Sequence, residues 1–307
     1  GEDEPRKVQI IPKEGGRAVG LREIPDYLVI GHVTQDLMPD GTYLAGGTVT
    51  YSGLTASRLG IKVGILTSAN PATPFFENVP SINVYRRASE RTTVFENIYV
   101  DGSRRQYVRA LAGTLTPDDL PDGWERTPVV HLGPMAQEID PTMVEAFPSA
   151  LLGLTPQGWL RHWDEQGLVF PVRWRFSLDV LGAADAVILS PEDVGYDEQQ
   201  IDLFRRHSRL LVLTNGMDGA IVYQGGQRQR VPAYDVIEVD PTGAGDVFAA
   251  AFMVRLFETG DAIEAARFAN CAASFIVQGV GTTHVPTREQ VEWRMRHGSL
   301  RSQRGWA

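Results

Sequence analysis

Six runs of apolar and β-branched residues recur along the chain, and within each run the apolar positions are continuous rather than alternating. They lie at residues 27–31, 62–69, 129–134, 151–156, 186–191 and 210–215. Continuous apolar runs indicate strands that are buried on both faces of a sheet. Helical patterns lie between several of them, as at 49–60 and 197–208. This alternation predicts an α/β fold, a three-layer α/β/α sandwich with a mostly parallel central sheet.

The carboxyl ends of the predicted strands are candidate site positions. In open parallel sheets, ligands bind beyond these ends. Gly133, Ser190 and Asn215 each close a predicted strand. Gln157 follows another strand and is placed where it can face the same cleft, whereas Trp159 and Leu160 are expected to pack in the core.

Two hairpin patterns interrupt the alternation. Residues 91–110 form two strand-like halves around Asp101-Gly102, and 219–233 form two around Gly225-Gly226. Polar residues occur on both faces of the first hairpin, so we expect it to leave the main sheet. Together with 36–45 it would form a small β lid over the site. The second hairpin is predicted to be an antiparallel edge of the main sheet.

Composition and charge along the chain predict where the main domain begins and ends, and they argue against nucleic acid and anionic membranes as partners. Of 307 residues, 43% are hydrophobic, which is enough for one large core. We expect an N-terminal extension at 1–25, one main domain at 26–293 and a basic, solvated C-terminal tail at 294–307. The net charge of -9 argues against binding to nucleic acid or to an anionic membrane.

The chain has a single cysteine and no long apolar segment. Cys271 excludes an intrachain disulfide and a multi-cysteine metal site, and we expect it to be a buried core thiol. No apolar run is long enough to span a bilayer, and the first residues lack the apolar region of a signal peptide. These features predict a cytoplasmic protein.

The stretch "DPTGAGDVFAAAFMV", Asp240 to Val254, carries the clearest chemistry. A strand predicted at 234–240 precedes it, and an apolar helix that should be buried follows. The first amides of a helix are unpaired and glycines expose them, so Thr242 to Gly245 are typical of an anion hole. Asp246 falls in the first turn, where an ionised carboxylate is favoured, as a general base requires. The alternative is a helix cap preceded by a simple turn.

In this stretch and in others the chain resembles the ribokinase-like, or PfkB-type, carbohydrate kinases. The resemblance extends over most of residues 26–290. It includes the blocks "GHVTQD" (31–36), "AGGTVTYSGLTASRLG" (45–60), the hairpin 91–110, "VLTNGMDGAIVY" (212–223) and "AARFANCAASFIVQGVGTTHVPTREQV" (265–291). The order and spacing of the blocks are more specific than any one of them. A Walker-type phosphate loop is missing from the sequence, and this family does not use one.

The resemblance implies a ribokinase-like fold and a role for each matching residue. Asp246 would deprotonate the acceptor hydroxyl, and the amides of Gly243, Ala244 and Gly245 would hold the transferred phosphoryl group. Asp36, Gly46 and Gly47 would contact the acceptor, with Tyr51 beside them and with Glu96 and Asn97 supplied by the lid. Asn215, Gly216, Gly219, Thr242 and Asn270 would surround the nucleotide. Each role has a simpler alternative: Asp36 as a loop acid, Gly216 and Gly219 as turn residues, Asn270 as a local hydrogen-bond donor in its helix.

The chain departs from the family pattern at two places. Tyr51 stands where the family usually has asparagine, which makes an inositol-like cyclitol credible beside ribose or fructose. An Asn-x-x-Glu motif that helps to organise Mg²⁺ is replaced by Ser190 and Asp193, with Glu192 adjacent. Carboxylate oxygens remain, so Mg²⁺ held through water is still expected at Glu192 and Asp193.

The leading hypothesis is therefore an ATP- and Mg²⁺-dependent kinase that phosphorylates a hydroxyl of a sugar or polyol. A nucleoside is the alternative acceptor, and a non-catalytic sugar or nucleotide sensor is the alternative function. The resemblance leaves open a monovalent cation such as K⁺ near Asp240, and a homodimer formed through the lid.

Overall fold

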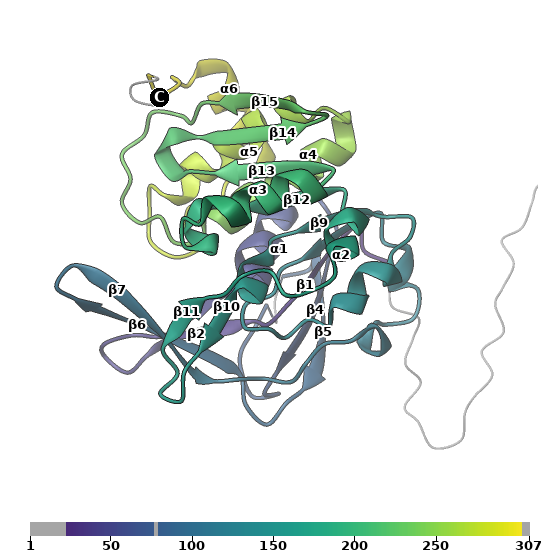
Figure 1. Cartoon of the computed structure of the whole chain (residues 1–307), viewed down its shortest axis with the longest axis vertical. Coiled ribbons are helices and arrows are strands. Elements are labelled where there is room, and N and C mark those ends of the chain that lie inside the picture. The colour runs from purple at the N-terminus through teal and green to yellow at the C-terminus, as the bar shows by residue number, and fades with distance from the viewer. Residues whose placement is uncertain (1–22, 77–78, 303–307) are drawn as a thin grey trace, which may run out of the picture.

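The central sheet of the computed structural model, which describes residues 23–76 and 79–302, has nine strands (Figure 1). Their spatial order is β15 (Gln227–Val231), β14 (Ala220–Gln224), β13 (Leu210–Thr214), β12 (Ala186–Leu189), β9 (Leu151–Leu154), β8 (Val129–Leu132), β1 (Tyr27–Ile30), β4 (Val63–Ala69) and β5 (Ile82–Ala88). The strands from β13 to β5 are parallel, and β14 and β15 extend the sheet as an antiparallel edge. All six strands predicted from the apolar runs are present, and the second hairpin lies at the predicted edge.

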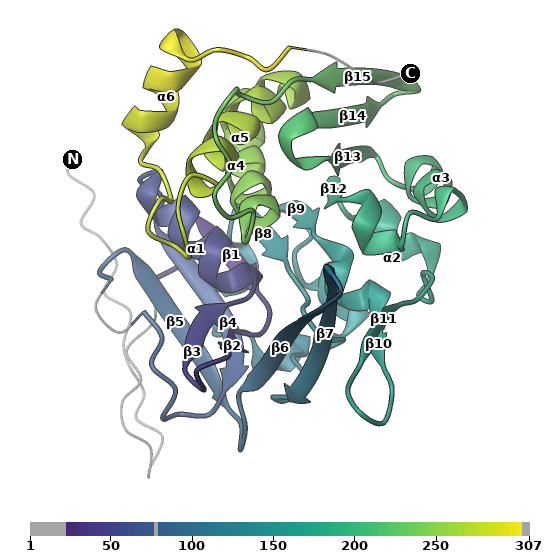
Figure 2. The ribbon, with the colours of Figure 1, turned by 90° about the vertical axis from the view of Figure 1, so that its left-hand side faces the viewer.

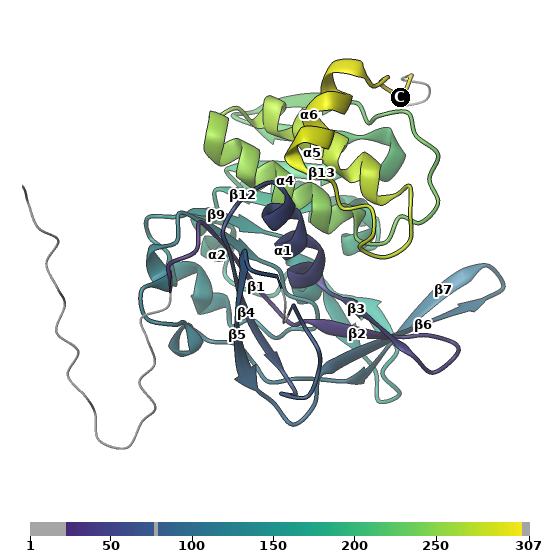
Figure 3. The same ribbon diagram turned by 180° about the vertical axis from the view of Figure 1, so that it is seen from behind.

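Helices cover both faces of this sheet, which confirms the three-layer α/β/α fold (Figures 1 and 3). One face carries α1 (Thr48–Arg58), α4 (Ala244–Thr259), α5 (Ala262–Ile276) and α6 (Arg288–His297). The other carries α2 (Leu178–Ala183) and α3 (Glu198–His207), with short 3-10 turns. Within β1, Tyr27 and Val29 face the first set of helices and Leu28 and Ile30 the second, so alternate side chains serve two cores.

The 3-10 turns connect the strands at several points. They are η1 (Pro117–Asp119), η2 (Trp124–Arg126), η3 (Pro141–Ala146), η4 (Pro156–Leu160), η5 (Pro191–Val194) and η6 (Gly216–Asp218). Three of them, η4, η5 and η6, begin within two residues of the ends of β9, β12 and β13. Polar side chains at these turns are therefore held at one edge of the sheet.

A separate four-stranded sheet contains both segments predicted for the lid, and we call it the lid sheet or, for short, the lid (Figure 2). Its order is β3 (Tyr43–Gly46), β2 (Thr34–Leu37), β6 (Thr93–Val100) and β7 (Ser103–Ala110). The turn of β6–β7 uses positive φ at Asp101 and Gly102, as the Asp-Gly pair predicts. A small hairpin of β10 (Arg161–Trp163) and β11 (Val169–Pro171) adjoins the lid, where the Val108 N–H donates to the Gly167 carbonyl oxygen at 2.8 Å.

Two predictions from the sequence are wrong: the strand at 234–240 and the start of the solvated tail at residue 294. The segment 234–240 forms no strand; Tyr234 makes an isolated bridge to Leu300, and Ile237 and Val239 are exposed. Its β-branched residues have no neighbouring strand with which to pair, and strand propensity depends on such pairing.

The basic tail is not solvated from residue 294 onward. Residues 294–297 belong to α6, where the Arg294 guanidinium donates to Ser274 Oγ and Gln278 Oε1 and lies 3.5 Å from the Phe275 ring centroid. Most of the N-terminal extension predicted at 1–25 lies outside the described residues. Within the part of the chain that is described, no helix is long and apolar enough to cross a membrane.

Candidate functional site

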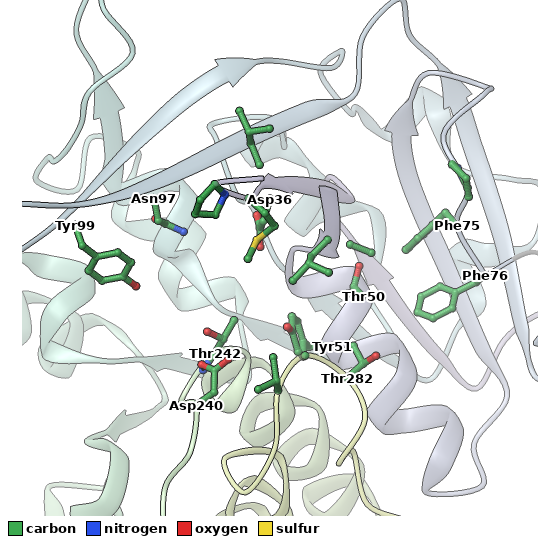
Figure 4. Close-up of a pocket in the computed structure, with 18 residues that line it drawn as sticks. Asp36, Thr50, Tyr51, Phe75, Phe76, Asn97, Tyr99, Asp240, Thr242 and Thr282 are labelled. Carbon is green, nitrogen blue, oxygen red and sulfur yellow. The ribbon is translucent and has the colours of Figure 1, made fainter. Parts of the chain in front are cut away.

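A cavity of about 720 Å³ lies between the lid sheet and the start of α4. Figure 4 shows Asp36 and Asn97 on the lid side, with Tyr51, Asp240 and Thr242 opposite. Phe75, Phe76 and Tyr99 contribute aromatic walls. The cavity therefore combines a few polar groups with a largely apolar lining, which is typical of small-molecule sites.

Helix α4 begins at the glycine-rich turn, as predicted. Gly243 is its N-cap, with a left-handed φ of 81°. A Cβ at this position would lie 2.3 Å from the Tyr51 ring, so the turn requires glycine for two reasons. The Ala244 N–H donates to the Pro241 carbonyl oxygen at 3.1 Å. Of the three amides expected in the anion hole, those of Gly243 and Gly245 are the two that make no hydrogen bond within the described residues.

Asp246 lies in the first turn of α4 and is tied to α1. The Thr48 hydroxyl donates to Asp246 Oδ1 at 2.9 Å, and the Ser52 hydroxyl donates to the Asp246 carbonyl oxygen at 2.8 Å. Burial raises the pKa of Asp246 from 3.8 to about 6, against the opposing effects of the Thr48 hydrogen bond and of Arg161. Desolvation therefore opposes the ionised form, which the helix terminus favours. Near neutral pH the group is nevertheless ionised.

Asp36, Gly46 and Gly47 meet at the lid side of the cavity. Burial raises the Asp36 pKa to about 6, partly offset by a 3.5 Å hydrogen bond from Thr34 and by Arg161. A Cβ on Gly46 would lie 2.7 Å from Asp36 Oδ2, and one on Gly47 would lie 2.6 Å from the His32 carbonyl oxygen. The Gly-Gly pair is thus needed for close backbone packing around the Asp36 carboxylate.

Tyr51 stands between the two acidic ends of the site. Burial raises the pKa of its phenol to about 12, and the charges of Asp36, Asp246 and Asp240 act in the same direction. Tyr51 is therefore a neutral hydroxyl group that lines the cavity at all ordinary pH values.

The two lid candidates, Glu96 and Asn97, point to opposite faces of β6. Asn97 lines the cavity, and its side-chain oxygen is buried without a hydrogen-bond partner among the described residues. Glu96 is not among the lining residues; its carboxylate accepts a hydrogen bond from Arg109 Nε at 2.7 Å. Strand alternation separates these neighbours, so the structure does not place Glu96 with the other substrate candidates.

The predicted nucleotide residues lie apart from this cavity, except for Thr242, which lines it. Asn215 and Gly216 form the η6 turn, and a Cβ on Gly219 would lie 2.2 Å from the Val231 carbonyl oxygen. Asn270 does not bond within its own helix. Its Nδ2 donates to the carbonyl oxygens of Val231 and Pro232, at 3.0 and 3.1 Å.

The metal candidates are engaged with other protein groups. Asp193 Oδ2 accepts the Ser190 N–H at 2.8 Å, and burial raises the pKa of this carboxyl. Glu192 is exposed and pairs with Arg104 of the lid at 3.2 Å. The described residues contain no group of three His, Cys, Asp or Glu side chains that could hold a metal ion. These positions suit an ion that keeps most of its waters.

Arg161 is the main residue that the sequence does not single out. Its Nη1 donates to the Met135 carbonyl oxygen and its Nη2 to Gln157 Oε1, both at 3.2 Å. Burial raises the pKa values of Asp36, Asp193 and Asp246, and the charge of Arg161 partly offsets each rise. The strand-end rule identifies Gln157, three residues after the end of β9, but the η4 turn brings Arg161 back to the same edge. That return depends on a turn that the apolar pattern does not reveal.

Comparisons with known proteins agree with the geometry. A model of the pfkB family carbohydrate kinases matches residues 189–288. The ribokinase of Bacillus subtilis (strain 168) is 45% identical over 83 residues, 27% of this chain and 28% of that enzyme. Inositol 3-kinase of Oryza sativa subsp. japonica is 25% identical over 319 residues, which cover 93% of this chain and 75% of that enzyme.

A solved structure shares the fold over nearly its whole length. It is a pyrophosphate-dependent kinase of the ribokinase family, complexed with a pyrophosphate analogue and myo-inositol. It is similar to this chain with a TM-score of 0.70 at 22% identity, covering 87% of this chain and 99% of that one. The ribokinase-like fold expected from the sequence is thereby confirmed.

Proposed function

Because a model of the pfkB family carbohydrate kinases matches residues 189–288, we propose that the chain transfers the γ-phosphoryl group of ATP to a hydroxyl of a sugar or cyclitol. The observation that carries the proposal is the position of Asp246. Its carboxylate lies at the open N-terminus of α4, tied to α1 and near the phenol of Tyr51, which lines the acceptor-sized cavity. A sensor would have no use for a base at this point.

The proposed reaction is a direct, in-line transfer. Asp246 takes the proton of the acceptor hydroxyl, whose oxygen forms a bond to the γ-phosphorus as the bond to the ADP oxygen breaks. The amides of Gly243 and Gly245 stabilise the charge on the phosphoryl oxygens. Arg161 adds a positive charge near the carboxylates of Asp36, Asp193 and Asp246.

The lining of the cavity favours a neutral acceptor. Asp36, Tyr51 and Asn97 offer acceptor and donor atoms suited to hydroxyl groups, and the Asn97 oxygen is buried without a partner. Among the described lining residues, two are acidic and none is Lys, Arg or His. An acceptor that already carries a phosphate would meet like charge, so we propose an unphosphorylated sugar or a cyclitol.

A divalent ion is proposed to accompany the nucleotide. Glu192 and Asp193 would contact Mg²⁺ through water, because the described residues offer no group of three His, Cys, Asp or Glu side chains for direct ligation. When bound, the ion would neutralise charge on the phosphates. A monovalent cation near Asp240 is proposed as an activator.

A nucleoside is the second candidate acceptor. The observation in its favour is the aromatic wall of Phe75, Phe76 and Tyr99, since a planar base stacks on such rings. The same rings also suit the C–H face of a sugar or cyclitol.

The test is ADP release from Mg·ATP with a panel of sugars, cyclitols and nucleosides, repeated with pyrophosphate as donor and with each acceptor pre-phosphorylated. We expect turnover with an unphosphorylated polyol and a loss of at least about a hundredfold in Asp246→Asn, the scale of a general base. Tight binding without turnover would favour the sensor. Near-wild-type turnover in Asp246→Asn would contradict the mechanism, and faster turnover with pyrophosphate would change the donor.

The lid is also the proposed site of dimer formation. Its sheet exposes the large apolar side chains Tyr43, Leu44, Ile98 and Tyr99. Tyr99 and Leu44 line the cavity, whereas Ile98 lies on the other face of β6 and is free to contact a second copy of the chain. Sedimentation of the wild type and of Ile98→Lys would test this, with a monomer in both cases contradicting it.

A further inference from the structure

A chain of three hydrogen bonds leads from Arg161 to Asp246. Arg161 Nη2 donates to Gln157 Oε1 at 3.2 Å, and Gln157 Nε2 donates to Thr48 Oγ1 at 3.3 Å. The Thr48 hydroxyl then donates to Asp246 Oδ1 at 2.9 Å. Resting on the proposed function, we infer that Gln157 and Thr48 are positioning residues that set the orientation and acidity of the general base.

The direction of this chain is fixed at its Arg161 end. A guanidinium has only donors, so Gln157 must turn its carbonyl oxygen towards Arg161 and its amide towards Thr48. With an N–H donor already directed at Oγ1, the single hydroxyl proton of Thr48 is available for Asp246. The guanidinium is itself held by the Met135 carbonyl oxygen and lies 5.6 Å from the Phe95 ring centroid.

We call the hydrogen bonds from Arg161 through Gln157 and Thr48 to Asp246 the relay. Packing leaves the side chains of the relay few other hydrogen-bond partners. Thr48 is fully buried, and it lies so close to Gly133 that a Cβ there would be 2.4 Å from its Cγ2. Met135 Sδ is 3.5 Å from both Thr48 Oγ1 and Gln157 Nε2, but a thioether is a weak acceptor beside a carboxylate. The Thr48 hydroxyl therefore keeps donating its hydrogen bond to Asp246 Oδ1.

The two carboxylate oxygens of Asp246 therefore have different roles. Oδ1 is occupied by Thr48, and Oδ2, with no intramolecular hydrogen bond within the described residues, is left to accept the substrate proton. A donated hydrogen bond also favours the ionised form and so counteracts the effect of burial. The relay would keep Oδ2 of Asp246 oriented towards the acceptor hydroxyl and would keep the carboxyl deprotonated near neutral pH.

Gln157→Glu tests the direction of the relay. Glutamate keeps the partner of Arg161 but presents an acceptor to Thr48, whose proton would then turn away from Asp246. We expect kcat to fall about tenfold with both KM values within about twofold, the pattern of a misplaced group rather than of lost binding. The acid limb of the kcat profile should move up by about one pH unit, the scale expected when a charge-assisted hydrogen bond is lost.

Thr48 supplies the test that separates the relay from simple charge. Thr48→Val has nearly the same shape and should shift the acid limb upward, whereas Thr48→Ser should restore it. In the Thr48→Val background, Gln157→Glu should add little, because the relay is already broken. An undiminished further shift there would mean that the glutamate acts by its charge alone, which would overturn the inference.

A matched control and a ligand-free measurement keep this test distinct from that of the kinase activity. Gln199→Glu makes the same change at an exposed glutamine that accepts a hydrogen bond from Arg173, and it should leave the profile unchanged. The carboxyl carbon of Asp246, assigned from Asp246→Asn in aspartate-labelled free protein, should titrate at higher pH in Gln157→Glu and Thr48→Val. An unchanged titration would overturn the relay, whereas a shifted titration in a protein without turnover would refute only the proposed function.

Discussion

Replacing Asp246 by asparagine is expected to stabilise the ligand-free protein above pH 6 while abolishing its proposed activity. Burial raises the pKa of this carboxyl from 3.8 to about 6, so ionising it costs more in the folded protein than in the unfolded chain. At 1.36 kcal/mol per pKa unit, the rise corresponds to about 3 kcal/mol of stability at pH 8. Asparagine is similar in shape, can still accept the Thr48 hydrogen bond and removes this cost.

The pH dependence of the gain follows from proton binding. Between pH 3.8 and about 6 the folded protein holds this proton more tightly than the unfolded chain, so the stability contributed by Asp246 falls as pH rises. The variant should therefore match the wild type near pH 4, gain through pH 6 and keep a constant advantage above it. A gain of about 3 kcal/mol corresponds to a rise in Tm of about 5 °C for a protein of this size.

The assay is thermal unfolding of both proteins from pH 4 to pH 8. Asp202→Asn serves as the control, because the hydrogen bond from Arg205 lowers the pKa of that exposed carboxyl and its removal should give no gain. An unchanged or lower Tm for Asp246→Asn at pH 8 would refute the argument that burial destabilises the ionised base. A gain that is independent of pH would refute it too.

Three further changes follow from the site. Asp36→Asn should raise the acceptor KM at least about tenfold at pH 8 with the donor KM nearly unchanged, since only the acceptor would lose a charge-assisted hydrogen bond; equal losses for both would contradict this. Gly243→Ala should lower both kcat and Tm because its Cβ would meet the Tyr51 ring, whereas Gly60→Ala, at a similar φ but in open space, should lower Tm only slightly. Cys271 should not react with a thiol reagent at pH 8 until the protein unfolds, because burial raises its pKa to about 12; rapid labelling of the folded protein would disprove this.

The central sheet and the anion-hole turn were predictable because their signals are local. Continuous apolar runs report strands with two buried faces, and glycines next to an apolar helix report an exposed helix N-terminus. The segment 234–240 shows where such signals fail. Its residues favour a strand, but no partner strand is adjacent, and only the arrangement of the sheet decides that.

The lid illustrates the same limit within a correctly predicted element. The hairpin at 91–110 was evident from its Asp-Gly turn, yet the separate roles of Glu96 and Asn97 depend on which face of β6 meets the cavity. The alternation of side chains along a strand predicts that neighbouring side chains point to opposite faces. It does not predict which of the two faces the cavity.

The sequence by itself determined the fold class and the glycine-rich turn that precedes a buried apolar helix, because each depends on residue type and spacing along a short stretch. Tertiary structure alone decided the acidity of Asp246, since burial is a property of the surrounding fold and outweighs the helix terminus. It also decided the relay from Arg161 through Gln157 and Thr48. Thr48 lies 109 positions before Gln157 and 198 before Asp246, and only the tertiary structure brings their polar atoms into hydrogen-bond distance.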